Sequence, residues 1–365
     1  MEFTIERDEF YKGLQRAQGI ASPKGSIPIL ANVLIDADGG KVTLFATNLD
    51  IGLKGSYDAT VATSGRVTVG AKKLHDIVRE LPSGPIQLRA EDDRLRVSAG
   101  KSRFNLATEP ADQFPSFPEY DESNLITLEG GMVNEMIRKT GYAISQDETR
   151  LTLNGAFFEV APDKVRMVAT DGHRLAYIHR EGAFGVKTPV KAIIARKAIG
   201  ELSKLAGESE EGLSFLLHDN HVMFRRGSLT LVVRLIEGAF PNYEQVIPKN
   251  HQKEARIPKD TFLRALRRVA TLADEKSHMV RLTFGDNSLT LASEGGEVGE
   301  ARDEIDIAYT GDEMVIGLNA LYVMDLLGAI DDDTVRFKMQ DSLSPVLALA
   351  MEDEGQMCIV MPMRL

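Results

Sequence analysis

Apolar and polar residues follow a pattern that recurs three times along this chain. Each recurrence opens with a short alternating segment and continues with apolar residues at helical spacing, at residues 3–14, 125–137 and 255–266. A period of two that gives way to a period of 3.6 predicts a strand followed by a helix. About 20 residues after each opening comes a segment with the signals of a β-hairpin, at residues 34–44, 157–167 and 280–291.

Each recurrence then continues with a second predicted strand and helix, at residues 67–81, 192–205 and 314–327, and closes with a further pair of strands. Internal repetition of this kind indicates repeated structural units. We therefore predict an α+β fold made of three domains of about 120 residues, each a duplicated strand–helix–strands unit with antiparallel sheets, and six helices in all. The predicted boundaries are residues 1–122, 123–250 and 251–365.

Composition narrows the class of protein. Hydrophobic residues make up 43% of the chain and charged residues 27%, which is ordinary for a globular protein. No apolar run approaches the roughly 20 residues that span a bilayer, and the charged N-terminus lacks the pattern of a signal peptide, so we expect a cytoplasmic protein without a membrane partner. Cys358 is the one cysteine, which excludes an internal disulfide and predicts a small buried side chain.

The formal net charge of −11 argues against nucleic-acid binding only if the charge is evenly spread. Basic residues instead recur on five of the six predicted helices. They are Lys12, Arg16, Lys72, Lys73, Arg79, Arg138, Lys139, Arg196, Lys197, Lys204, Arg264, Arg267 and Arg268. A single charged helix face is usually only solvated, but equivalent helices of a repeat share one side of an assembly. Repeated basic helices thus favour a surface that contacts the nucleic-acid backbone without reading sequence.

Catalytic motifs are weak in this sequence. Asp171 and His173 could form an acid–base pair, and His218 and His221 could bind a metal, but Asp-Gly and Asp-Asn in these segments are typical of turns. No phosphate-binding glycine-rich loop and no nucleophile–histidine–acid set is present. We therefore predict a protein without catalytic residues, cofactor or metal.

The motifs resemble those of the bacterial DNA sliding clamp, the beta subunit of DNA polymerase III, over essentially the whole chain. The resemblance rests on Pro28-Ile29-Leu30, Ser102-Arg103-Phe104, the run from Ala169 to Ala176, Arg196-Lys197, Phe240-Pro241-x-Tyr243 and the C-terminal run from Val360 to Leu365. It implies a ring-shaped, head-to-tail homodimer, with helices inside and sheets outside, that encircles double-stranded DNA and carries out no chemistry. DNA polymerase III core, the clamp loader, other polymerases and repair enzymes would bind it through a short peptide.

Three sets of residues carry family roles by this resemblance. The DNA-contacting set is Lys24, Lys72, Gln146, Arg150, Arg196 and Lys197, although the acids of the 146–152 loop disfavour contacts there. The partner-peptide pocket is Thr170, Gly172, His173, Arg174, Leu175, Pro241, Val246, Val360, Met361, Pro362, Met363 and Arg364. The dimer interface is Arg103, Phe104 and Leu106 on one side, with Leu272 and the acids of residues 297–304 on the other.

Further expectations concern the pocket itself. Arg174 and Arg364 would donate hydrogen bonds to the peptide, whereas Met357 and Ile359 would be ordinary core. The apolar C-terminal run from Met357 is expected to dock as a strand, because free termini are normally polar. Two rival functions stay open at this point: an enzyme that uses Asp171 and His173, and a repeat scaffold that binds only proteins.

Overall fold

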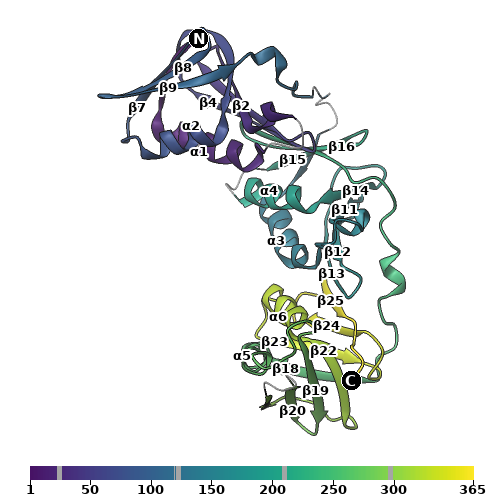
Figure 1. The fold of residues 1–365 in the computed structure, drawn as a ribbon. Coiled ribbons are helices and arrows are strands. Elements are labelled where there is room, and N and C mark those ends of the chain that lie inside the picture. The colour runs from purple at the N-terminus through teal and green to yellow at the C-terminus, as the bar shows by residue number, and fades with distance from the viewer. Residues whose placement is uncertain (23–26, 119, 121–124, 208–211, 295–298) are drawn as a thin grey trace. The chain divides into compact units, whose positions relative to one another are not determined.

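The computed structural model describes residues 1–22, 27–118, 120, 125–207, 212–294 and 299–365. The chain forms two compact units, one of residues 1–130 and 204–235 and the other of residues 131–203 and 236–365. Figure 1 shows their helices and strands. None of the described helices is long and apolar enough to cross a membrane.

The first unit holds one antiparallel sheet of 13 strands with two α-helices. Its elements are β1 (Glu2–Glu6), α1 (Arg7–Ile20), β2 (Asn32–Asp38), β3 (Lys41–Thr47), β4 (Ile51–Asp58), β5 (Thr60–Thr63), β6 (Gly65–Gly70), α2 (Ala71–Glu80), β7 (Pro85–Glu91), β8 (Arg94–Ala99), β9 (Ser102–Glu109), β10 (Ile126–Leu128), β15 (Leu213–His218), β16 (His221–Arg226) and β17 (Leu229–Arg234). The strand order is β10-β15-β16-β17-β4-β3-β2-β6-β9-β8-β7-β1-β5.

The second unit holds an eight-stranded sheet and a four-stranded sheet. Its elements are α3 (Gly130–Thr140), β11 (Gly155–Val160), β12 (Lys164–Thr170), β13 (Arg174–Glu181), β14 (Val190–Ala195), α4 (Arg196–Gly207), β18 (Lys253–Pro258), α5 (Lys259–Ala270), β19 (Met279–Gly285), β20 (Ser288–Glu294), β21 (Glu300–Asp306), β22 (Met314–Asn319), α6 (Ala320–Ala329), β23 (Thr334–Met339), β24 (Val346–Ala350) and β25 (Gln356–Val360). The sheet orders are β14-β11-β12-β13-β25-β24-β23-β18 and β21-β20-β19-β22.

The predicted strand–helix openings and the six α-helices are confirmed within the described residues. The predicted closing pair of strands is wrong in number, because each repeat closes with three: β7 to β9, β15 to β17, and β23 to β25. Each predicted hairpin also continues into a third strand, β4, β13 or β21.

Helices pack in pairs against the sheets, one pair for each repeat. α1 packs on α2, where the rings of Tyr11 and His75 stack at 5.1 Å, and Figure 1 shows these two helices side by side. Ser203 of α4 and Asn134 of α3 are joined by a 2.7 Å hydrogen bond, and α5 packs on α6. The buried faces are apolar at spacings of three and four residues, as Phe10, Leu14 and Ala17 of α1 illustrate.

The middle repeat contributes strands to both units. Its β17 pairs with β4 of the first repeat, from Leu229 opposite Gly55 to Val233 opposite Ile51. Its β13 pairs with β25 at the end of the chain, from Arg174 opposite Val360 to Ile178 opposite Gln356. The C-terminal run is therefore a docked strand, as expected, and in Figure 1 the yellow β25 lies beside the teal β13.

Candidate functional site

A small apolar cavity of about 150 Å³ lies in the second unit, where β13 and β25 meet. Seven of the residues assigned to the pocket line it: Thr170, Gly172, Arg174, Leu175, Pro241, Val246 and Met361. Its other lining residues are Leu153, Asn242, Tyr243 and Ile359. Segments that are nearly 200 residues apart in the sequence thus build one hollow, and Leu175 is buried within it while Met361 is 39% exposed at its mouth.

The turn between β12 and β13 forms one wall of this cavity. The Asp171 carboxylate accepts hydrogen bonds from the backbone amides of His173 and Arg174, at 2.9 and 3.0 Å. The Thr170 hydroxyl donates to the Arg174 carbonyl, and Gly172 has a φ of +90°, a conformation that side-chain-bearing residues rarely adopt. These bonds hold the turn so that Leu175 follows at a position facing the cavity.

The C-terminal strand supplies alternate residues to the cavity. Ile359 and Met361 line it, whereas Val360 belongs to the large buried core next to α5 and α6. Val360 therefore lies outside the described lining, because neighbouring residues of a strand face opposite sides. Ile359 is buried in a core cluster, as predicted, and also lines the cavity.

Four other residues of the assigned pocket are absent from the described lining. The backbone of His173 accepts a hydrogen bond from the Met361 amide at 2.8 Å, and Met363 donates to the Gly317 carbonyl at 2.8 Å, which ties the chain end to β22. Pro362 is half-buried and Arg364 is exposed. The structure therefore uses His173 and Met363 to dock the C-terminal run, and the four side chains lie outside the cavity.

Sequence reasoning missed Leu153, Asn242, Tyr243 and Ile359. Tyr243 lies in the Phe240-Pro241-x-Tyr243 motif, and its hydroxyl accepts a 3.1 Å hydrogen bond from Arg166. Period-two alternation from Met361 could have identified Ile359. Leu153 stands in the short 3₁₀ turn Leu151–Leu153, and no sequence signal marks it.

The guanidinium of Arg174 forms hydrogen bonds with three groups of the protein. It donates to Asp171 at 3.0 Å, to Asp325 of α6 at 2.5 Å and to the Tyr142 carbonyl at 2.7 Å. It also lies 4.4 Å from the ring centroid of Tyr322. Arg174 therefore joins the pocket turn to α6. That it also donates hydrogen bonds to a bound peptide stays a prediction.

The two sets of candidate catalytic and metal-binding residues form turns. Both Asp171 oxygens are used by the turn and by Arg174, and the His173 ring stacks on Tyr322 at 6.5 Å. His218 and His221 pair across the β15–β16 hairpin, whose turn residue Asp219 has a φ of +50°. No cluster of three or more potential metal ligands occurs among the described residues. The predicted turns are confirmed.

A buried cluster of charges lies in the same unit as the cavity. Lys139, whose side chain is only 4% exposed, contacts Glu135 at 3.0 Å, Asp353 at 2.7 Å and Asp331 at 3.3 Å. Arg180 donates to both Asp353 oxygens and to Glu135. The prediction that Lys139 belongs to a basic helix surface is wrong, because carboxylates of its own helix and of distant segments enclose its ammonium group.

This cluster lowers the pKa of its Asp353 carboxylate. Burial opposes the ionised form of Asp353, but hydrogen bonds from Arg180 and Lys139 outweigh it and lower its pKa to about 2. Nearby, burial raises the pKa of Cys358 to about 11, and its sulfur accepts a 3.1 Å hydrogen bond from Tyr142. The thiol is therefore a buried core group, as predicted.

The residues assigned to DNA contact differ in their exposure and in their contacts within the chain. Lys72 in the first turn of α2, and Arg196 and Lys197 in the first turn of α4, are all exposed. Gln146 is exposed too, whereas Arg150 pairs with Asp147 at 3.4 Å and donates to the Asp171 carbonyl at 3.1 Å. Arg150 is thus bound to the pocket turn. Lys24 lies outside the described residues.

The residues assigned to the dimer interface lie on two strands with an open edge. Arg103, Phe104 and Leu106 are in β9, which along residues 102–107 pairs only with β8 among the strands described. β21 pairs only with β20 in the described part of the chain. Leu272 is half-buried beside Gly299, just before β21, and residues 297 and 298 lie outside the described residues.

Comparison with known proteins matches every one of the three repeats. The N-terminal, central and C-terminal domain models of the DNA polymerase III beta subunit match residues 1–118, 127–242 and 244–364. The chain is 36% identical to the beta sliding clamp of Caulobacter vibrioides and 33% identical to that of Escherichia coli, covering all of each protein.

Solved structures of sliding clamps are also similar to this chain over its whole length. The crystal structure of the DNA polymerase III subunit beta from Pseudomonas aeruginosa superposes with a TM-score of 0.95 at 34% identity, over all of both chains. A sliding clamp from the same organism, bound to griselimycin, gives a TM-score of 0.96 at the same identity and coverage.

Proposed function

Because this chain belongs to the DNA polymerase III beta subunit family, the beta sliding clamps, we propose that it closes as a head-to-tail homodimer around duplex DNA and tethers replication enzymes to it. It is a processivity factor and not itself an enzyme. We propose domain boundaries at residues 1–122, 123–250 and 251–365, and we place the protein in the cytoplasm with the DNA on which it acts. Purified protein, once loaded, should stay on nicked circular DNA and slide off after linearisation; equal retention on both would favour the protein-only scaffold.

The open strand edges support the dimer. β9 offers unpaired backbone groups with Arg103 beside them, and β21 offers the same with four acids, Glu300, Asp303, Glu304 and Asp306. An edge strand readily pairs with a strand of another chain. A contact between two different surfaces that closes on itself yields a ring without free ends.

We expect the Leu106→Asp variant to be monomeric at micromolar concentration, where the unaltered protein scatters light with twice the mass of the chain. Leu106 shares a face with buried Leu95 across the β8–β9 pairing, so a charge there enters the apolar part of the contact. Asn105→Asp, on the opposite face of β9, is the control and should stay dimeric. A monomeric unaltered protein would refute the proposed interface.

The exposed cations at helix starts support DNA binding. The first turn of a helix carries unsatisfied amides and the positive end of the helix dipole, so a cation there adds to a site for phosphate. Gly70 caps α2 without a side chain, which leaves these amides available beside Lys72. By contrast, α6 has no basic residue and its first amides bond to the side chain of Asn319.

We expect the Lys72→Glu, Arg196→Glu, Lys197→Glu triple variant to support markedly less processive synthesis at moderate salt. Removing one phosphate contact should reduce the slope of log affinity against log salt by about 0.9. The control reverses three exposed lysines elsewhere, Lys187, Lys249 and Lys276. Identical processivity and salt dependence in the two triple variants would show that these helix starts do not contact DNA.

For the partner site we propose the apolar cavity beside β13 and β25, occupied by a short peptide with leucine- and phenylalanine-type anchors. The observation that carries this proposal is the apolar hollow built from Leu175, Val246, Ile359 and Met361 next to a turn fixed by its own hydrogen bonds. A preformed apolar cavity with few polar groups is typical of a ligand site. Methionine at its mouth would adapt to several related peptides.

A further inference from the structure

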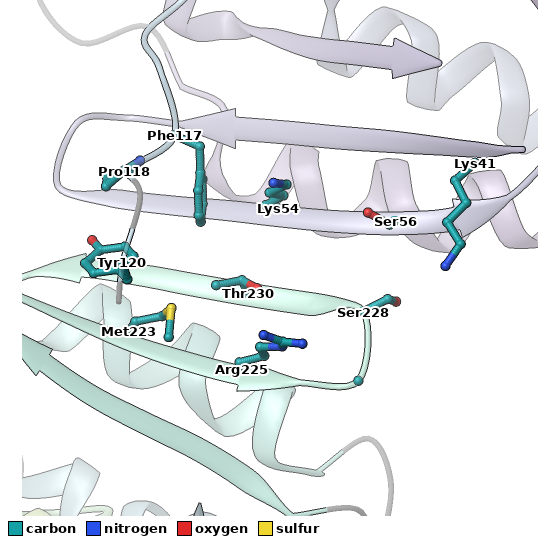
Figure 2. A pocket seen from close by; sticks show the side chains of 11 residues that line it. Lys41, Lys54, Ser56, Phe117, Pro118, Tyr120, Met223, Arg225, Ser228 and Thr230 are labelled. Carbon is teal, nitrogen blue, oxygen red and sulfur yellow. The ribbon is translucent and has the colours of Figure 1, made fainter. Parts of the chain in front are cut away.

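A second, larger hollow lies on the sheet of the first unit and differs in character from the apolar cavity. It measures about 780 Å³ and opens across β3, β4, β16 and β17 (Figure 2). Its lining residues are Lys41, Lys54, Ser56, Phe117, Pro118, Tyr120, Met223, Arg225, Gly227, Ser228 and Thr230. We call these residues the basic groove.

The pairing of strands places the cations of the basic groove on one face of the sheet. Lys54 of β4 is opposite Thr230 of β17, which is in turn opposite Arg225 of β16, and Figure 2 shows these three side chains on neighbouring strands. Two strand spacings separate Lys54 from Arg225, about 10 Å. Lys41 is opposite Asp58, four residues beyond Lys54, about 14 Å along the strand.

Hydroxyl groups fill the space between these cations. Ser56 bonds to the Thr43 hydroxyl at 2.8 Å, and its amide donates to the Ser228 carbonyl at 3.3 Å. Ser228, in the turn before β17, and Thr230 of β17 both line the basic groove. The floor of the basic groove therefore offers donors to an anion along its length.

The described lining of the basic groove carries positive charge only. Three cations line it, of which Arg225 makes a further interaction within the protein, and none of the described lining residues is an aspartate or glutamate; Asp38 and Asp58, both opposite Lys41, stand outside the lining. The chain as a whole has a formal net charge of −11. A cationic hollow on such a protein attracts anions locally, because clefts concentrate the field of the charges that line them.

The aromatic residues of the basic groove are already packed. The Lys54 ammonium lies 5.2 Å from the ring centroid of Phe117, and that ring packs at 88° against Phe45. Tyr120 packs edge-on against His218 at 5.7 Å. Nucleic-acid strands bind best where aromatic faces are open for bases to stack, so this arrangement favours carboxylates over bases.

We propose that the basic groove binds an acidic, extended segment of a partner protein. Acidic residues two apart on an extended chain place their carboxylates about 7 Å from each other, so a segment of roughly five residues reaches from Lys54 to Lys41. The hydroxyls of Ser228 and Thr230 donate to the same carboxylates or to the peptide backbone. This site lies outside the apolar cavity and could be occupied together with a peptide there.

The test is fluorescence anisotropy with a fluorescein-labelled decapeptide in which glutamate and serine alternate, at low ionic strength. The full-length protein should bind it saturably, and the Lys41→Glu, Lys54→Glu variant should bind at least fivefold more weakly. Both lysines are exposed, so the variant should fold. The control, Lys187→Glu with Lys276→Glu, makes the same change of net charge elsewhere and should bind within twofold of the unaltered protein.

Three outcomes would overturn the proposal. Saturable binding could be absent in the unaltered protein, or the control pair could weaken binding as much as the groove pair, which would indicate unspecific attraction. In a parallel titration with a twelve-residue oligothymidine, the groove pair could lose more affinity for the oligonucleotide than for the peptide, which would make the occupant a nucleic acid. Far-ultraviolet circular dichroism of each variant checks that it is folded.

Discussion

Replacing both Leu175 and Met361 by alanine is expected to weaken the binding of a clamp-binding peptide by at least tenfold, with the dimer intact. Both side chains line the apolar cavity, Leu175 at its base and Met361 at its mouth. Truncating one well-buried anchor of this kind typically costs about 1 to 3 kcal/mol. Titration calorimetry of the peptide into each protein measures the effect, and light scattering checks the dimer.

Met363→Ala is the matched control for this experiment. It removes the same kind of side chain two residues away, but Met363 lies outside the described lining and docks through its backbone amide. Its affinity should stay within about twofold of the unaltered protein. Equal losses in Met363→Ala and in the double variant would place the peptide outside this cavity. Deleting the run from Val360 would be less informative, because Val360 is part of the core.

Lys139→Ala is expected to destabilise the second unit by about 3 to 5 kcal/mol, the usual cost of removing one partner from a buried ion pair. The substitution removes one of the two cations that Glu135 and Asp353 share and leaves Arg180 as the other. Arg138→Ala is the control on the same helix, because Arg138 and its partner Asp331 are both about half exposed and such pairs contribute at most about 1 kcal/mol. Urea unfolding followed by hydrogen exchange of β25 measures both.

The same cluster predicts how stability depends on pH. The pKa of Asp353 is lowered in the folded protein from 3.8 to about 2, so its ionised form favours folding. That contribution is fully present above about pH 4 and disappears as the pH falls toward 2. The unaltered protein should therefore lose stability below pH 4, and Asp353→Asn should lose less over the same range. Equal slopes of unfolding free energy against pH in the unaltered protein and in Asp353→Asn would contradict this prediction. Equal urea midpoints for Lys139→Ala and Arg138→Ala would contradict the preceding one.

Local chemistry accounts for what could be predicted from the sequence. Asp171 and Gly172 form a turn because an aspartate accepts nearby amides and glycine adopts a positive φ, and both properties are independent of the rest of the chain. Likewise, the change from a period of two to 3.6 is a property of the repeats themselves, so the strand–helix openings were correct. The apolar C-terminal run predicted a docked strand because a free apolar end would be unfavourable in water.

Long-range packing accounts for what could not. Whether Ile359 or Val360 enters the cavity depends on the register of β25 against β13, and a shift of one residue exchanges the two faces. Whether a cation on a helix faces water depends on carboxylates far away in the chain: Lys139 meets Asp331 and Asp353, while Lys197 stays exposed. By itself the sequence determined the repeats, the turns and the family; the tertiary structure decided which side chains form the cavity, because burial and pairing arise only when distant segments come together.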